Sequence, residues 1–176
     1  YFPKFDWPRV ENTQAEFPTE DNIESIKQKE EKALSQVREI VAEQKNDIAA
    51  LIIEPIQGEG GDNHFRKEFM QAIEKICDEN EIFFVVDEVQ SGMGLTGKWW
   101  AHQHYGITPD ALAFGKKSQV CGIFVGEKID EVEKHVFKES SRINSTWGGN
   151  LVDMVRAQRY LEIIDEDNLV ENAAKM

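Results

Sequence analysis

Four short runs of apolar residues constrain the fold of this chain more than any other feature. Each run is stopped by glycine, proline or a charged residue: AALIIEPI (49–56), IFFVVDEV (82–89), ALAFG (111–115) and GIFVG (122–126). Continuous apolar runs of this length are typical of strands that are buried on both faces. Two other stretches, 21–45 and 65–80, space their apolar residues for one face of a helix. This order predicts an α/β fold with a mostly parallel sheet flanked by helices.

The rest of the chain is predicted to form loops and short helices around this sheet. Residues 1–20 carry three prolines among aromatic residues, which indicates a tethered loop rather than a regular element. We expect loops at GEGGDN (58–63) and GMGLTG (92–97), a short helix over 99–105, and a last helix from about 148 onward. A length of 176 residues fits about one domain with a real core.

The composition restricts the partners and the setting of the protein. The net charge of −13 argues against nucleic-acid binding, which depends on Lys and Arg, and against binding to an anionic membrane surface. No apolar run approaches the roughly 20 residues of a membrane span. Cys77 and Cys121 are far apart and in no paired motif, which favours a reducing, cytoplasmic setting. Cys121 is expected to be a small buried side chain.

Polar residues follow three of the predicted strands at the point where each strand ends. They are Glu54–Gln57, Asp87–Gln90 and Lys116–Lys117. In open α/β sheets, ligands bind beyond the carboxyl ends of the parallel strands. The sequence therefore predicts a ligand site at one edge of the sheet, built from these three clusters.

The stretch VVDEVQSGMGLTGKWW (85–100) resembles nucleotide-binding motifs but matches none of them. Its glycines spell G-x-G-x-x-G, but a dinucleotide motif opens a long helix directly after its strand, and here Asp87 to Ser91 intervene. The ATPase loop requires Ser or Thr after its lysine, and Trp99 stands at that position. The glycines of GEGGD suit either an anion cradle of backbone N–H groups or a flexible turn, and both alternatives stay open.

Two further patterns are expected to be structural. His102 and His104 form H-x-H without a Cys or a third His at useful spacing, so we expect histidines on a helix surface and no metal site. The Glu and Lys run at 24–32 is expected to be a solvated helix face.

Asp87 is an unusual residue in this pattern, because it is a charged residue at the end of a predicted buried strand. A buried charge must be paired, and Lys116 ends a neighbouring predicted strand. One alternative is a structural ion pair between the two. The other is a cofactor site in which acid and amine touch different atoms of one ring. Pyridoxal phosphate requires such a pair, a lysine for the Schiff base and an acid for the pyridinium nitrogen.

Four ordered motifs then resemble one known family. EPIQGEGGDN, FFVVDEVQSGMGLTGKWWAHQHYG, PDALAFGKK and STWGGNLVDMVRA are similar to class III pyridoxal-phosphate aminotransferases, the omega-aminotransferases, over about residues 50–165. The resemblance implies that 1–176 is part of the large domain of a fold-type I pyridoxal-phosphate transferase. Residues 1–20 would be a loop, and 148–176 a helix leading toward a small domain that the chain lacks. FGKKSQVCG and FPKFDWPRV are similar to the lysine 6-aminotransferases, with the 4-aminobutyrate enzymes as near relatives.

The resemblance also implies roles for the residues that would touch the cofactor. Lys116, and not Lys117, matches the lysine that binds pyridoxal phosphate as a Schiff base. Asp87 matches the acid on the pyridinium nitrogen, and Gln90 the side chain at the phenolic oxygen. Thr146 matches a residue that reaches the cofactor phosphate of the neighbouring protomer, which implies a homodimer with shared active sites.

The substrates are implied in the same way. Glu59 matches a glutamate that pairs with an arginine and moves for the second substrate, and Glu54 an acid that lines the site. The implied reaction moves the terminal amino group of L-lysine to 2-oxoglutarate, giving the 6-semialdehyde and glutamate; 4-aminobutyrate and ornithine are alternative donors. An α/β interaction domain without cofactor is the alternative outside enzymes. The family's phosphate-binding turn and its arginine lie outside the chain, so we expect the isolated fragment to be inactive.

Overall fold

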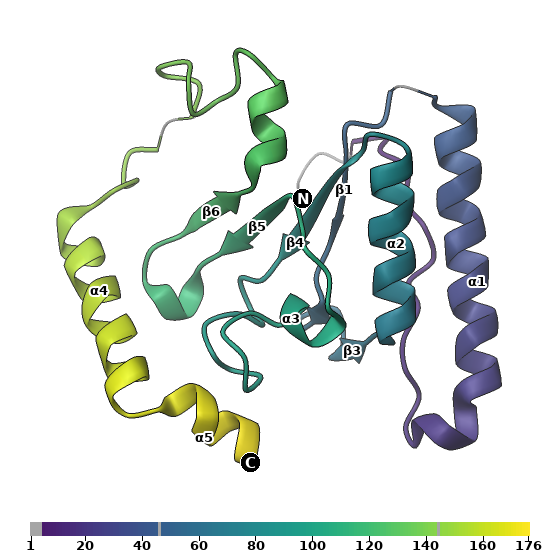
Figure 1. Cartoon of the computed structure of the whole chain (residues 1–176), viewed down its shortest axis with the longest axis horizontal. Coiled ribbons are helices and arrows are strands. Elements are labelled where there is room, and N and C mark those ends of the chain that lie inside the picture. The colour runs from purple at the N-terminus through teal and green to yellow at the C-terminus, as the bar shows by residue number, and fades with distance from the viewer. Residues whose placement is uncertain (1–4, 46, 144) are drawn as a thin grey trace.

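A computed structural model describes residues 5–45, 47–143 and 145–176, and its centre is a four-stranded sheet in the order β1-β4-β5-β6 (Figure 1). The strands are β1 (Ala50–Ile53), β4 (Phe83–Asp87), β5 (Ala111–Phe114) and β6 (Gly122–Val125). The first three are parallel, and β6 is antiparallel to β5. The predicted α/β class with a mostly parallel sheet is confirmed. A separate antiparallel pair joins β2 (Ile56–Gln57) to β3 (Asn63–His64).

Five α-helices and two 3-10 helices complete the described chain. The α-helices are α1 (Thr19–Glu43), α2 (Lys67–Glu79), α3 (His102–Tyr105), α4 (Leu151–Glu166) and α5 (Leu169–Lys175). The 3-10 helices are η1 (Lys116–Ser118) and η2 (Glu127–Glu131). Acids in the first turn of α1 suit the positive end of the helix dipole. The Asn150 side chain caps α4, because it accepts a hydrogen bond from Val152 N. Among the described residues, none of these helices has the length and apolarity to cross a membrane.

The hydrophobic core lies between the sheet and the helix pair α1–α2, which stand together on one side of it (Figure 1). Alternation along β4 directs Phe84 and Val86 into this core, where Phe69 and Ile73 of α2 are also buried. Burial of each such side chain contributes about 1.5–3 kcal/mol. The same alternation directs Asp87 to the opposite face, away from the core.

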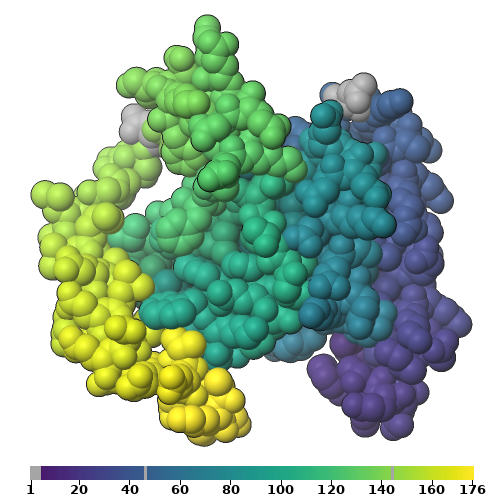
Figure 2. Space-filling view, in the orientation of Figure 1, coloured from purple at the N-terminus to yellow at the C-terminus, as the bar shows by residue number. Residues whose placement is uncertain are grey.

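That opposite face of the sheet is largely open. Ile52 of β1 is 66% exposed and Ile123 of β6 is 47% exposed. The C-terminal helix α4 also keeps apolar residues in solvent, Leu151 at 81% and Val155 at 68%. Figure 2 shows the C-terminal segment in yellow along one side of the molecule, with α1 in purple on the other side. The open face of the sheet and α4 thus both present apolar side chains to solvent.

The structure corrects four details of the prediction. The fourth strand runs antiparallel, and the predicted loop 58–63 is mostly the turn of the β2–β3 pair, with Asn63 already in β3. The last helix is two helices, because Asn168 adopts a left-handed φ of 53° between them. The Glu and Lys run in α1 is not wholly solvated: Glu30 is buried, and Arg66 donates to its Oε2 from Nε at 2.9 Å and from a terminal nitrogen at 2.6 Å.

Candidate active site

The predicted site residues meet at the carboxyl edge of the three parallel strands. Asp87 is the last residue of β4, the central strand of the three. Glu54 follows β1 directly, and Lys116 opens η1 one residue after β5. Because the three strands run in the same direction, their carboxyl ends share one edge of the sheet. The convergence of polar clusters expected from the sequence is therefore present.

Asp87 keeps one carboxylate oxygen available. Its Oδ1 accepts a hydrogen bond from the backbone N–H of Val89 at 3.0 Å, which fixes the orientation of the half-buried side chain. Within the part of the chain that the structure describes, Oδ2 has no hydrogen bond and Asp87 forms no ion pair with Lys116. The alternative of a structural ion pair is therefore not what the structure shows. The free oxygen suits an N–H donor from a ligand.

The two adjacent lysines have different surroundings. Lys116 is exposed and has a left-handed φ of 53°. Lys117 is half-buried, and its Nζ donates a hydrogen bond to the backbone oxygen of Gln90. Burial, and then the charge of Lys116, lower the pKa of the Lys117 ammonium. Lys117 thus ties the turn after β5 to the turn after β4, while the amine of Lys116 makes no hydrogen bond to any described residue.

Gln90 also touches the loop that carries the two predicted substrate residues. A Cβ built at Gly58 would lie 2.8 Å from Nε2 of Gln90, so the loop backbone packs directly against this side chain. The N–H of Gly58 donates to Oε2 of Glu54 at 3.3 Å. Glu59 comes next in the chain and is exposed. The loop that carries Glu54 and Glu59 therefore lies against Gln90.

An amide cluster that sequence reasoning missed anchors the same loop. Asn12 and Gln57 exchange two side-chain hydrogen bonds, at 2.6 and 2.9 Å. Asn63 donates to Oε1 of Gln57 at 2.9 Å and to the backbone oxygen of Gly60 at 3.0 Å. These contacts attach the N-terminal segment to both ends of the loop. No periodicity links residues 45 positions apart, so only the structure reveals them.

Glu88 is the second residue that sequence reasoning undervalued. Its side chain is fully buried and accepts backbone N–H groups from Ala101 at 2.6 Å and from His102 at 2.7 Å. It also contacts Nδ1 of His102 at 2.9 Å and accepts from the hydroxyl of Ser91 at 3.2 Å. The prediction that His102 lies on a helix surface is therefore wrong, because its side chain is a partner of a buried acid.

The glycine motif serves close packing. A Cβ at Gly94 would lie 2.9 Å from Val170, and one at Gly97 would lie 2.6 Å from the Cα of Ala174, so both glycines make room for α5. Their φ angles of 86° and 85° are left-handed, where glycine is favoured. Packing against a helix accounts for the G-x-G-x-x-G spacing without a phosphate.

Two predicted residues lie apart from the cluster or differ from expectation. Cys121 is exposed, so the prediction of a buried side chain is wrong; it precedes an edge strand and lies 2.9 Å from a Cβ built at Gly115. Thr146 is exposed in the segment before α4. No hydrogen bond among the described residues joins Thr146 to the other predicted site residues.

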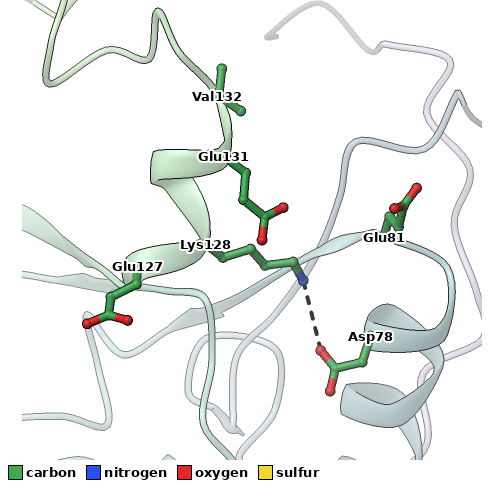
Figure 3. Close-up of a pocket in the computed structure, with 6 residues that line it drawn as sticks. All are labelled: Asp78, Glu81, Glu127, Lys128, Glu131 and Val132. Carbon is green, nitrogen blue, oxygen red and sulfur yellow. Dashed lines mark ion pairs between the residues drawn. The ribbon is translucent and has the colours of Figure 1, made fainter.

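A hollow at the opposite edge of the sheet is unrelated to this cluster (Figure 3). Acids surround Lys128 there, which contacts Asp110 at 2.8 Å and Asp78 at 3.9 Å. Burial opposes the charge of Lys128, but Asp110 raises its pKa above the ordinary value. The Lys128 Nζ also donates to the backbone oxygen of Ile82, before β4. These contacts hold η2 to the amino ends of the strands, and no group of three metal-ligating residues occurs among the described residues.

The donor set at the carboxyl edge fits pyridoxal phosphate. Asp87, an oriented carboxylate with one oxygen free of hydrogen bonds to the described residues, ends β4. Lys116, a primary amine with no hydrogen-bond partner in the same part of the chain, follows the adjacent parallel strand β5. These are the two groups that the pyridinium nitrogen and the aldehyde of the cofactor require. Gln90 lies between the Lys117 amine and the Glu54–Glu59 loop.

Comparisons with known proteins agree with this fit. The sequence profile of a family described as "Aminotransferase class-III" matches residues 3–176. An L-lysine-epsilon aminotransferase from Streptomyces clavuligerus is 51% identical over 174 residues, which are 99% of this chain and 38% of that protein. A probable mitochondrial 4-aminobutyrate aminotransferase from Caenorhabditis elegans is 36% identical over 99% of this chain and 36% of its own length. A solved lysine aminotransferase from Mycobacterium tuberculosis, in the internal aldimine form, superimposes with a TM-score of 0.85 at 49% identity, covering 97% of this chain and 39% of that one. The chain spans less than half the length of these relatives.

Proposed function

This chain belongs to the class III aminotransferases, and on that premise we propose that it is the cofactor-binding part of a lysine 6-aminotransferase. Enzymes of this class use pyridoxal phosphate. The observation that carries the proposal is that an oriented Asp87 and a Lys116 amine without a hydrogen-bond partner among the described residues stand at the ends of adjacent parallel strands. Residues 1–176 then form part of the large domain, and α4 and α5 lead toward the remainder of the protein.

Lysine is the proposed amino donor because identity is higher to the lysine enzymes than to the 4-aminobutyrate enzyme, 51% against 36%. The terminal amino group of L-lysine would pass to 2-oxoglutarate, giving the 6-semialdehyde and glutamate. Ornithine and 4-aminobutyrate are the alternative donors, supported by the lower but substantial similarity to those enzymes.

The chemistry divides between the cofactor and three side chains. Pyridoxal phosphate, when bound, supplies a cationic ring that accepts the electrons left when the substrate carbon loses its proton. Asp87 would hold the ring nitrogen in its protonated form, because an opposite charge favours the charged state. Lys116 would hold the cofactor through its aldehyde carbon and, once displaced by the substrate amine, would act as the base that takes the proton from the amine-bearing carbon of the substrate. Gln90 would donate to the phenolic oxygen, from a position that Lys117 and Gly58 fix.

Substrate selection is assigned to the loop beside Gln90. Glu59 would neutralise an arginine from the remainder of the protein while lysine reacts, and would release it for the α-carboxylate of 2-oxoglutarate. Glu54 lines the same space. Thr146 is exposed, as a residue that serves the cofactor phosphate of a neighbouring protomer must be, and so supports a homodimer with shared sites. Two free cysteines support a cytoplasmic location.

The test uses the full-length protein that contains this chain, loaded with pyridoxal phosphate. L-lysine should shift its visible absorbance band faster than 4-aminobutyrate or ornithine does, and 2-oxoglutarate should restore the band. A faster response to one of the other two amines would assign the enzyme to that donor. A protein that takes up no cofactor would instead be the α/β interaction domain.

A further inference from the structure

A buried carboxylate stands directly beside the acid that is assigned to the cofactor. Glu88 directly follows Asp87 in the chain, and its side chain has no exposed area. Burying an ionised group costs several kcal/mol unless hydrogen bonds compensate it. Four contacts do so here, from Ala101 N, His102 N, His102 Nδ1 and Ser91 Oγ.

These contacts close a loop around the active-site turn. The chain leaves β4 at Asp87, passes through Gln90 and Ser91, and comes back to Glu88 at Ala101. The Glu88 side chain accepts hydrogen bonds from both Ser91 and Ala101, so it links the start of this loop to its end. The backbone of Glu88 is fixed as well, because its N–H donates to Ala113 O of β5 and its oxygen accepts from Gly92 N, each at 2.9 Å. Backbone and side-chain hydrogen bonds therefore hold Glu88 in place between Asp87 and Gln90.

We propose that Glu88 is a positioning residue, which together with His102 sets the place of Asp87 and Gln90 against the cofactor ring. The inference rests on the proposed function. Glu88 touches neither cofactor nor substrate and acts only through its neighbours. A purely structural buried acid would stabilise the fold without affecting cofactor binding, and the two roles can be separated.

Glu30 provides the matched control. It is also a buried glutamate, satisfied by Arg66 at the start of α2, and none of its hydrogen bonds among the described residues reaches Asp87, Gln90 or the turn between them. In the full-length protein, Glu88→Gln places an amide NH₂ against backbone donors, and Glu30→Gln removes a charge from a buried pair. Both variants should lower the melting temperature of the cofactor-free protein. Only Glu88→Gln should weaken pyridoxal phosphate binding, by about tenfold or more, the value of a hydrogen bond to a charged group.

A spectroscopic readout reports on Asp87 itself. Because Asp87 controls the protonation of the ring nitrogen, its displacement in Glu88→Gln should move the pH midpoint of the bound cofactor's visible band, and Glu30→Gln should leave it in place. His102→Asn keeps a nitrogen donor near the position of Nδ1 and should retain wild-type affinity. His102→Leu removes that donor and should lose affinity in the same direction as Glu88→Gln.

The outcomes are distinct. Weaker binding and a moved midpoint in Glu88→Gln and His102→Leu, with His102→Asn and Glu30→Gln normal, support the inference. If Glu88→Gln does not fold, the His102 pair decides alone. Equal cofactor affinity in all four variants overturns the positioning role while the proposed function stands. A wild-type protein that binds no pyridoxal phosphate overturns both.

Discussion

Gly58 lies so close to the side chain of Gln90 that a Cβ on the glycine would be 2.8 Å from Nε2 and 2.9 Å from Cδ of that residue. The Glu54–Glu59 loop and the Gln90 turn therefore form one surface rather than two. A movement of the loop would displace the side chain of Gln90. The backbone oxygen of Gln90 accepts a hydrogen bond from the Lys117 amine. Substrate-side and cofactor-side residues are coupled through this contact.

Gly58→Ala tests that coupling. The added methyl group must displace the flexible Gln90 side chain, so we expect little change in stability, below about 1 kcal/mol, but a reduced turnover. Turnover and melting temperature of the full-length enzyme are compared with those of Gly126→Ala, where the nearest atom to the new Cβ is 3.6 Å away at the other edge of the sheet. Equal activity of both variants and wild type would show that Gln90 tolerates displacement.

Lys116, not Lys117, is expected to carry the cofactor. The Lys117 amine is engaged with Gln90 O, whereas that of Lys116 has no hydrogen bond to a described residue. Borohydride reduction of the loaded full-length protein, followed by peptide mass spectrometry, should find the pyridoxyl group on Lys116. Modification of Lys117 or Lys98 instead would refute the assignment.

Asp87→Asn should lower turnover about a hundredfold or more without unfolding the protein. The Asn side chain keeps an oxygen that accepts from Val89 N, so the turn is preserved, while the charge that protonates the ring nitrogen is lost. Steady-state kinetics and circular dichroism of the full-length variant check the two halves of this expectation. Near-normal kcat in a folded variant would remove Asp87 from the mechanism.

Much of this architecture was predictable because burial and periodicity are local. The runs at 82–89 and 111–115 became β4 and β5, and the resemblance carried by four motifs to the class III aminotransferases is confirmed. The carboxyl-edge cluster followed from strand direction alone. The antiparallel direction of β6 is also a local consequence, because only seven residues connect Phe114 to Gly122 and a parallel crossover needs about a dozen or more.

The unpredicted features depend on contacts between distant residues. Glu88 and His102 are 14 positions apart, and Glu30 and Arg66 are 36 apart, so no helical or strand period joins them. Gly97 meets Ala174 only because α5 folds back on the glycine loop. Cys121 became exposed for a related reason: it lies just before an edge strand, outside the packed layer. The site roles of all six residues stay predictions: Lys116, Asp87, Gln90, Thr146, Glu54 and Glu59.

Cys77 gives the protein a pH-dependent stability at alkaline pH. Burial raises the pKa of its thiol from 9.0 to about 12, so the folded state keeps a proton that the unfolded chain loses. This contribution is complete below pH 9 and is lost as the pH rises toward 12. Urea unfolding of the full-length protein should show a smaller loss of stability between pH 9 and 11 in Cys77→Ala than in wild type. Parallel pH profiles would mean that the thiol does not contribute.

Glu59 is expected to let one site serve two substrates. Lysine enters with its terminal amine and has no carboxylate near the reacting carbon, whereas 2-oxoglutarate brings one that an arginine clamps with two hydrogen bonds. An uncovered arginine would favour carboxylate-bearing amines as donors, and Glu59 can neutralise it during the first half-reaction. The residue is exposed in a loop with three flanking glycines, which permit backbone movement against Gln90.

Glu59→Ala should therefore slow the half-reaction with lysine more than the half-reaction with 2-oxoglutarate, and glutamate should become a better competing donor. Single-turnover rates of both halves, measured on the full-length enzyme from the cofactor absorbance, decide the matter. Asp62→Asn, at an exposed acid in the same turn, is the control for loss of negative charge, because Asn suits the left-handed φ of 53° at this position, and it should leave the ratio of the two rates unchanged. Equal losses in both halves for Glu59→Ala, or a changed ratio in Asp62→Asn as well, would assign the effect to loop charge instead of a switch at Glu59.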